Sequence, residues 1–264
     1  MGLIYEELTH QLIGCFFEVH NKLGVGYDEK AYHKALEKLF QMRGISFRSK
    51  ERKTLSHRDC KVKDFEVDFI AFDKIILELK SLQSNFLQSN YIQILSELKL
   101  WDLRLGLLVN FGLQKVEFER IPFNEKEKRI NENYDFIKSF ITETERHVLG
   151  KLRDAILFIF NTHGLGYGES VYHKMLAIEL DYRKINYQTQ FPIEVRFEEN
   201  IISTFKMKPI LVENQIVCDI KALKDTIDFY DIAKIQSYLR ALKLNIGIIV
   251  NFASDQLEIK GIRA

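Results

Sequence analysis

The sequence has little cysteine, no long hydrophobic run and no excess of charge of either sign. Its three cysteines, Cys15, Cys60 and Cys218, form no CxxC pair, which argues against a disulfide framework and a cysteine zinc site. The strongest apolar runs, 105–111 and 246–252, are far shorter than the roughly 20 residues of a membrane-spanning helix. Acidic residues interrupt the N-terminal stretch, so it does not resemble a signal peptide. We therefore expect a cytoplasmic protein that does not associate with membranes.

The net charge is close to zero over the whole chain. Lysine and arginine total 38, and aspartate and glutamate total 37, which gives a formal net charge of +1. This balance excludes a globally basic nucleic-acid-binding surface but leaves room for a local basic patch. The 264 residues, 46% of them hydrophobic, are enough for one large domain or two small ones.

The second half of the chain repeats the first. Residues 24–36 read GVGYDEKAYHKAL, and residues 164–176 read GLGYGESVYHKML. Farther along, LGLLVNF at 105–111 recurs as IGIIVNF at 246–252. Two matched blocks in the same order indicate a tandem duplication. The expected organisation is two domains and a charged, helical linker between them, at 1–123, 148–264 and 124–147 respectively.

The first copy combines helical and strand patterns. Apolar residues at steps of three or four predict amphipathic helices, and runs of Val, Ile, Phe and Leu predict strands. The expected elements are two helices, a β-hairpin, a crossover helix and two further strands, at 8–23, 29–42, 61–71 with 75–81, 86–102, 105–111 and 115–121. This order predicts an α/β sandwich with a mixed sheet in each copy.

Charged residues interrupt the hairpin of the first copy. If its turn is centred on Asp73, Asp68 opposes Glu78, and Glu66 opposes Lys80. Directly opposed carboxylates destabilise a sheet, and a hard cation such as Mg²⁺ between them would remove that cost. Lys80 projects from the same strand face as Glu78 and could assist a water nucleophile or balance charge on a phosphate. The pattern predicts a site that hydrolyses phosphodiesters.

A structural interpretation of the same residues stays open. Glu66 and Lys80 could form a cross-strand salt bridge, with Asp68 and Glu78 solvated. The setting of Glu78 and Lys80 favours the catalytic interpretation, because they lie in the apolar stretch IILELKSL, where an unpaired charge is costly.

The motifs of the first copy, taken in order, resemble one known family. They are G-x-x-E-x-x-Y at 26–32, Asp68, E-L-K at 78–80 and GLLVNFG at 106–112. This series is similar to the GxxExxY proteins, a small branch of the PD-(D/E)XK nuclease superfamily. The resemblance implies two tandem restriction-endonuclease-like α/β sandwich domains, each a mixed sheet flanked by helices. It also implies a Mg²⁺-dependent nuclease site, with Mn²⁺ as a possible substitute.

The resemblance assigns a role to each residue of that site. Asp68 and Glu78 would be the metal ligands, Lys80 the catalytic lysine and Glu29 a further acid supplied by a helix. In the second copy Glu169, Asp219 and Lys221 correspond to Glu29, Glu78 and Lys80, and Gln236 is the helix glutamine that the family usually shows. There Asp68 is replaced by Pro209, which has no carboxylate, so we expect a degenerate second site and activity in the first domain alone.

The first copy departs from the family on the helix after the Glu-x-Lys strand. The family has a Gln followed two residues later by a Tyr, where this copy has Leu95 and Glu97. Gln93 lies nearby, but two residues turn a helix by about 200°, so we expect Gln93 to face away from the site.

A basic segment precedes the strand that carries Asp68. It spans 48–63 and contains Arg48, Lys50, Arg52, Lys53, Arg58, Lys61 and Lys63. These side chains could hold a nucleic-acid backbone at the mouth of the site. Equally, they could protect an exposed strand edge from pairing with other chains.

Four aromatic and imidazole side chains recur in both copies. Tyr32 and Tyr172 are expected to pack their helices, while His33 and His173 are expected at solvated helix positions.

Two functions follow from the sequence. The first is a Mg²⁺-dependent nuclease acting on nucleic acid, DNA in the first instance. The alternative is an inactive tandem pseudo-nuclease that binds nucleic acid or protein. Both include intramolecular pairing of the two domains.

Overall fold

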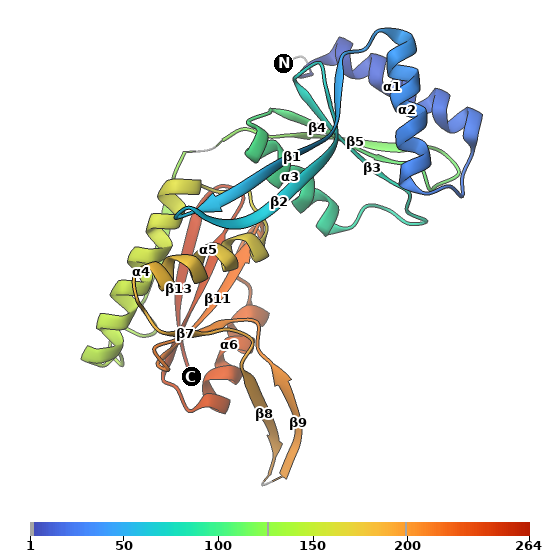
Figure 1. Ribbon diagram of the computed structural model, residues 1–264. Coiled ribbons are helices and arrows are strands. Elements are labelled where there is room, and N and C mark those ends of the chain that lie inside the picture. Colours follow the sequence, from blue (N-terminus) through green and yellow to red (C-terminus); the bar gives the residue numbers. More distant parts are fainter. Residues whose placement is uncertain (1–2, 126, 199) are drawn as a thin grey trace. The chain divides into compact units, whose positions relative to one another are not determined.

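The chain divides into two α/β units. The computed structural model describes residues 3–125, 127–198 and 200–264. Residues up to Leu55, together with Lys63–Glu125, form the first unit, and Ser56–Val62 belongs with the residues after 126 to the second. Each unit contains a mixed sheet flanked by helices (Figure 1), as the repeat predicts.

The first unit is built on a five-stranded sheet in the order β1-β2-β3-β4-β5. The strands are β1 (Phe47–His57), β2 (Cys60–Ala71), β3 (Ile75–Lys80), β4 (Leu105–Asn110) and β5 (Glu117–Pro122). β2 and β3 are antiparallel, β3 and β4 are parallel, and β4 and β5 are antiparallel. The helix α3 (Gln88–Trp101) makes the crossover that parallel strands require.

Helices cover both faces of this sheet (Figure 1). α1 (Glu6–Leu23) and α2 (Glu29–Arg43) bury their apolar sides with Phe69 and Leu107 in one core. α3 buries Ile94 and Leu98 against the other face. Asp28 caps α2 through its side chain, and Gly44 ends the helix in the left-handed conformation. The helices therefore lie where the sequence predicts them.

The second unit repeats this plan with additions. Its helices are α4 (Glu143–His163), α5 (Glu169–Tyr182) and α6 (Phe229–Leu242). The six strands of its main sheet, in spatial order, are β6 (Ile130–Asn133), β13 (Leu257–Arg263), β12 (Ile246–Phe252), β11 (Ile216–Ala222), β10 (Ile210–Val212) and β7 (Tyr187–Gln188). A separate two-stranded ribbon consists of β8 (Pro192–Phe197) and β9 (Asn200–Lys206).

The segment between the copies differs from the expected helical linker. Within 124–147, residues Ile130–Asn133 form β6, which pairs in parallel with β13 of the second sheet. Helix begins only at Glu143, where Thr142 and Glu145 form a capping box. The backbone pairing offered by β13 decides the conformation of a segment whose own pattern is weak. Throughout the described residues, the helices are too short or too polar to cross a membrane.

Candidate active site

The β2–β3 hairpin has the register that the sequence predicts. Phe72 and Asp73 turn the chain with φ of 55° and 54°, a left-handed pair that fits tightly twisted hairpins. Phe69 pairs with Leu77, and the ladder continues from there to the turn. Beyond Phe69 and Leu77, backbone-to-side-chain hydrogen bonds replace the ladder and join Asp68 to Glu78 and Leu79.

The two carboxylates are held by the backbone of the opposite strand. The amide of Leu79 donates to Asp68 Oδ2 over 2.7 Å, and the amide of Asp68 donates to Glu78 Oε1 over 3.3 Å. The Glu78 residue is only 2% exposed and Asp68 is 8% exposed. These backbone donors give hydrogen-bond partners to carboxylate oxygens that burial removes from water.

Lys80 lies beside Glu78, as its position two residues along the strand implies. Its Nζ is 3.3 Å from Glu78 Oε2 and 3.3 Å from Gln93 Oε1. The alternative partner, Glu66, instead binds Arg52 at 2.6 Å and Lys50 at 3.5 Å in the structure. The hairpin therefore brings Asp68, Glu78 and Lys80 into one cluster, and its buried acids contradict the solvated interpretation.

Two side chains of α3 join this cluster. Gln93 Nε2 donates to Glu78 Oε2 over 2.7 Å and to Glu97 Oε1 over 3.0 Å. The expectation that Gln93 faces away was wrong, because residues four apart share a helix face and both of these face β3. The repeat contained the signal, since an offset of 141 aligns Gln93 with Lys234, which occupies the equivalent place in the second unit.

Burial makes this acidic cluster difficult to ionise. It raises the pKa of Glu78 well above its usual value, and the neighbouring carboxylates of Glu97 and Asp68 raise it further while Lys80 opposes them. Burial likewise raises the pKa of Glu97 to about 7. Glu97 Oε2 is buried and has no hydrogen-bond partner among the described residues. A cation beside these oxygens would relieve both the repulsion and the unpaired oxygen.

The donor set fits a hard divalent cation. Within the described ranges, no group of three or more His, Cys, Asp or Glu side chains is arranged as a ready metal site. Mg²⁺ does not require one, because it commonly binds through one or two carboxylates and keeps several waters. Asp68 and Glu78 would supply those carboxylates, with the unpartnered oxygen of Glu97 nearby.

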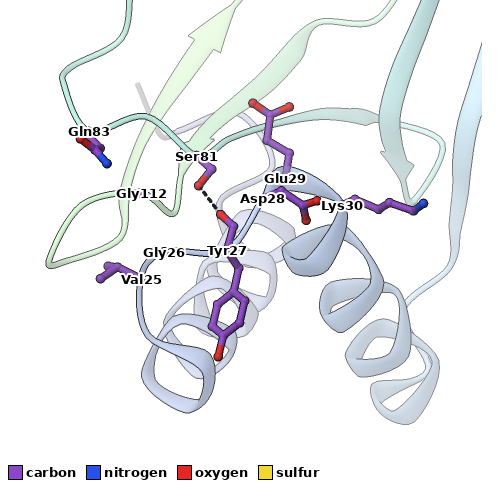
Figure 2. Close-up of a pocket in the computed structure, with 9 residues that line it drawn as sticks. All are labelled: Val25, Gly26, Tyr27, Asp28, Glu29, Lys30, Ser81, Gln83 and Gly112. Carbon is purple, nitrogen blue, oxygen red and sulfur yellow. Dashed lines mark hydrogen bonds between the residues drawn. The ribbon is translucent and has the colours of Figure 1, made fainter.

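A cavity of about 770 Å³ opens next to the end of β3. Figure 2 shows its lining, which is Val25, Gly26, Tyr27, Asp28, Glu29, Lys30, Ser81, Gln83 and Gly112. Ser81 directly follows Lys80, and its Oγ donates to the carbonyl of Tyr27 over 2.6 Å. The exposed Glu29 therefore lines the space beside the strand that carries Glu78 and Lys80.

The loop after β3 is held in place by Asn110 and Gly112. Asn110 Oδ1 accepts from the amides of Leu82 at 2.9 Å and Gly112 at 3.0 Å. A Cβ at Gly112 would lie 2.4 Å from the carbonyl oxygen of Leu82. Only glycine permits this approach, which fixes the chain directly after Lys80.

The basic segment lies mainly on β1, an edge strand of the first sheet. Most of its charges already have partners. Arg48 pairs with Asp73, Lys50 with Asp68, Arg52 with Glu66 and Arg58 with Glu179, while Lys53 donates to the carbonyl of Leu100 and Lys63 lies over the ring of Phe65. Its position suits the protection of a strand edge, and contact with nucleic acid stays a prediction.

The repeated tyrosines are structural, as expected, and His33 is buried and not solvated. Tyr32 and Tyr172 each donate over 2.8 Å to the carbonyl of the glycine that ends the preceding helix. The imidazole of His33 stacks on Phe69 and lies 3.2 Å from the carbonyl of Asp68. That contact helps to position the strand segment that carries the candidate ligand.

The equivalent site of the second unit is organised around a lysine. Ile210 pairs with Cys218, so Pro209 falls opposite Asp219 and no second carboxylate faces it from that strand. Asp219 Oδ2 lies 2.9 Å from the ammonium of Lys234 and 3.3 Å from that of Lys221. Burial alone would lower the pKa of Lys234, but the charge of Asp219 and its hydrogen bond, with smaller contributions from Lys221 and Glu169, together outweigh burial, and the pKa is raised.

Glu169 and Gln236 are the other two residues predicted for the second site, and their surroundings differ. The charge of Glu169 makes a small contribution to the raised pKa of Lys234. The amide of Gln236 instead donates to the carbonyl of Arg263 over 3.1 Å. Its inclusion in the site was wrong, because Gln236 stands about 200° around the helix from Lys234.

Comparison with known proteins places the chain in a family. The model of the PD-(D/E)XK nuclease superfamily matches residues 6–121 and again residues 146–263. No curated protein matches the chain. Among solved structures, the chain is similar to the crystal structure of SSO0001, with 18% identity and a TM-score of 0.31; the match covers 46% of this chain and 59% of that one. Because the family model matches both halves, the protein belongs to the PD-(D/E)XK nuclease superfamily.

Proposed function

We propose that the first unit is a Mg²⁺-dependent nuclease that hydrolyses phosphodiester bonds in nucleic acid, DNA in the first instance. The observation that carries the proposal is the opposition of Asp68 and Glu78 on adjacent strands, with Lys80 beside them. Membership of the PD-(D/E)XK nuclease superfamily supports nuclease chemistry for this unit. The motif at 26–32 supports placing the unit in the GxxExxY branch.

Each side chain has a part that its position supports. Asp68 and Glu78 would hold the cation, since the backbone amides of the opposing strands fix both carboxylates. When bound, Mg²⁺ would neutralise phosphate charge and lower the pKa of a water nucleophile. Lys80 would orient that water or balance charge developing on the phosphate. Glu29, in the adjacent cavity, is the further acid.

The second unit is proposed to be catalytically degenerate. Its acid pair is lost through Pro209, and Asp219 is compensated by Lys234 and Lys221 instead. This arrangement supports a binding or structural part for the second unit. If the first unit proved inactive, the same binding or structural part would be the proposal for the whole chain.

A cleavage assay tests the proposal. The purified protein is incubated with single-stranded DNA, double-stranded DNA and RNA, in Mg²⁺ or in EDTA, beside the Glu78→Ala and Lys80→Ala variants. We expect cleavage of at least one substrate by the parent protein in Mg²⁺ only, and its loss in both variants. Cleavage that persists in the variants indicates a contaminating nuclease. No cleavage of any substrate refutes the nuclease function and favours the inactive binding module.

A further inference from the structure

Each carboxylate site has a lysine ammonium bound to its central aspartate. Lys50 Nζ lies 2.6 Å from Asp68 Oδ1 in the first unit, and Lys234 Nζ lies 2.9 Å from Asp219 Oδ2 in the second. The two lysines come from different elements, β1 and α6. The contact is therefore not one inherited by both copies from a common ancestor. In both units a lysine side chain compensates an acid that would be costly to bury alone.

The two carboxylate oxygens of Asp68 are not equivalent. Oδ2 accepts the backbone amide of Leu79 over 2.7 Å, a contact that belongs to the hairpin itself. Oδ1 is engaged by Lys50. A divalent cation that uses Asp68 as a ligand would therefore compete with the Lys50 ammonium for Oδ1, because two cations cannot share that position without strong repulsion.

The backbone and exposure of Lys50 suit such an exchange. Its φ is 53°, a left-handed conformation that is unfavourable for a residue with a Cβ and unusual within a strand. Its side chain is 50% exposed, whereas that of Lys234 is 21% exposed. Lys50 can thus leave its carboxylate for solvent or for a phosphate, while Lys234 is enclosed beside Lys221.

We propose that Lys50 is an exchangeable counter-ion of the first site, which holds Asp68 while no divalent cation is bound and transfers to a nucleic-acid phosphate when the cation binds. This inference rests on the proposed function, because it takes Asp68 as a cation ligand. It assigns Lys50 a positioning role that couples the two binding events. Cation binding frees the ammonium for the phosphate, and phosphate binding by Lys50 frees Asp68 for the cation, as reciprocal linkage requires.

A Mn²⁺ titration measures the first half of the exchange. Free Mn²⁺ is followed by electron paramagnetic resonance in the parent protein and in Lys50→Met, Lys50→Gln, Asp68→Asn and Lys22→Met. Lys22 is a matched control, since it is an exposed lysine of the same unit that pairs with Glu18. We expect both Lys50 variants to bind Mn²⁺ about two- to fivefold more tightly, the range for losing a half-exposed ion pair. Lys22→Met should match the parent.

A DNA-binding measurement tests the second half. Fluorescence anisotropy with a labelled DNA duplex is recorded in Ca²⁺ and in EDTA for the parent and for Lys50→Met. We expect the substitution to weaken binding in Ca²⁺ by more than it does in EDTA, because the ammonium is tied to Asp68 without a cation. An equal loss of DNA affinity in both buffers would contradict the exchange. That result is expected if Lys50 contacts phosphate whether or not a cation is bound.

The possible failures are distinguishable. If Asp68→Asn loses Mn²⁺ while Lys50→Met binds it no more tightly than the parent, the metal site stands and the exchange is refuted. If no protein in the series binds Mn²⁺, the proposed metal site fails and the exchange fails with it. Circular dichroism of both Lys50 variants separates either result from unfolding, and Lys50→Gln keeps a polar group at the position.

Discussion

The buried carboxyl of Glu97 contributes to a loss of stability of the first unit as pH rises, and Glu97→Gln should remove that contribution. Glu97 is 1% exposed, and burial raises its pKa from 4.5 to about 7. Between these values the folded state keeps a proton that the unfolded state has released. The stabilisation is therefore fully present below pH 4.5 and is lost as pH rises through about 7. Each pH unit in that window lowers the free energy of unfolding by about 1.4 kcal/mol, which gives about 3 kcal/mol in all.

The assay can be confined to the first unit, because Trp101 on α3 is the one tryptophan of the sequence. Urea denaturation of the metal-free protein in EDTA is followed by its fluorescence from pH 4.5 to 8. We expect the free energy of unfolding of Glu97→Gln to exceed that of the parent by up to about 3 kcal/mol at pH 8. Near pH 4.5 the two free energies should be equal. The exposed Glu117, substituted by Gln, is the control. A parent-like pH dependence in Glu97→Gln would refute a buried, protonated carboxyl.

Two further predictions concern packing and charge. Gly112→Ala should lower the stability of the first unit by about 1–3 kcal/mol, because its Cβ would lie 2.4 Å from the Leu82 carbonyl oxygen. Gly150→Ala meets nothing within 4 Å and should be neutral or stabilising, so a loss of similar size in both variants would contradict the steric explanation. Lys234→Met should destabilise the second unit by about 1–3 kcal/mol, less than breaking an isolated buried pair, because Asp219 keeps Lys221. Denaturation followed by circular dichroism measures this, and a more stable variant would show that the lysine is not needed to compensate Asp219.

The sequence contains the features that place Asp68 and Glu78 together. A short turn at Phe72 and Asp73 determines which residues of β2 and β3 face each other, so counting from the turn is enough to oppose the two acids. The tandem repeat predicts the second unit in the same way. These features can be predicted because the sequence pattern and the turn depend only on residues that are neighbours in the sequence.

The contribution of α3 could not be read so directly. Which face of the helix meets β3 depends on packing of Ile94 and Leu98 against the sheet, and that packing directs Gln93 and Glu97 at Glu78. The family pattern pointed instead to position 95. For the same reason, the strand β6 depends on the edge that β13 offers and not on its own four residues.

The central claim is that cleavage requires the acid pair of the first unit and not Asp219 of the second. The most direct measurement compares Mg²⁺-dependent cleavage by the Glu78→Gln and Asp219→Asn variants, each shown by circular dichroism to be folded. We predict that Glu78→Gln abolishes cleavage while Asp219→Asn retains the parent rate. Loss of cleavage in folded Asp219→Asn, or full activity in Glu78→Gln, would contradict the assignment of the active site to the first unit.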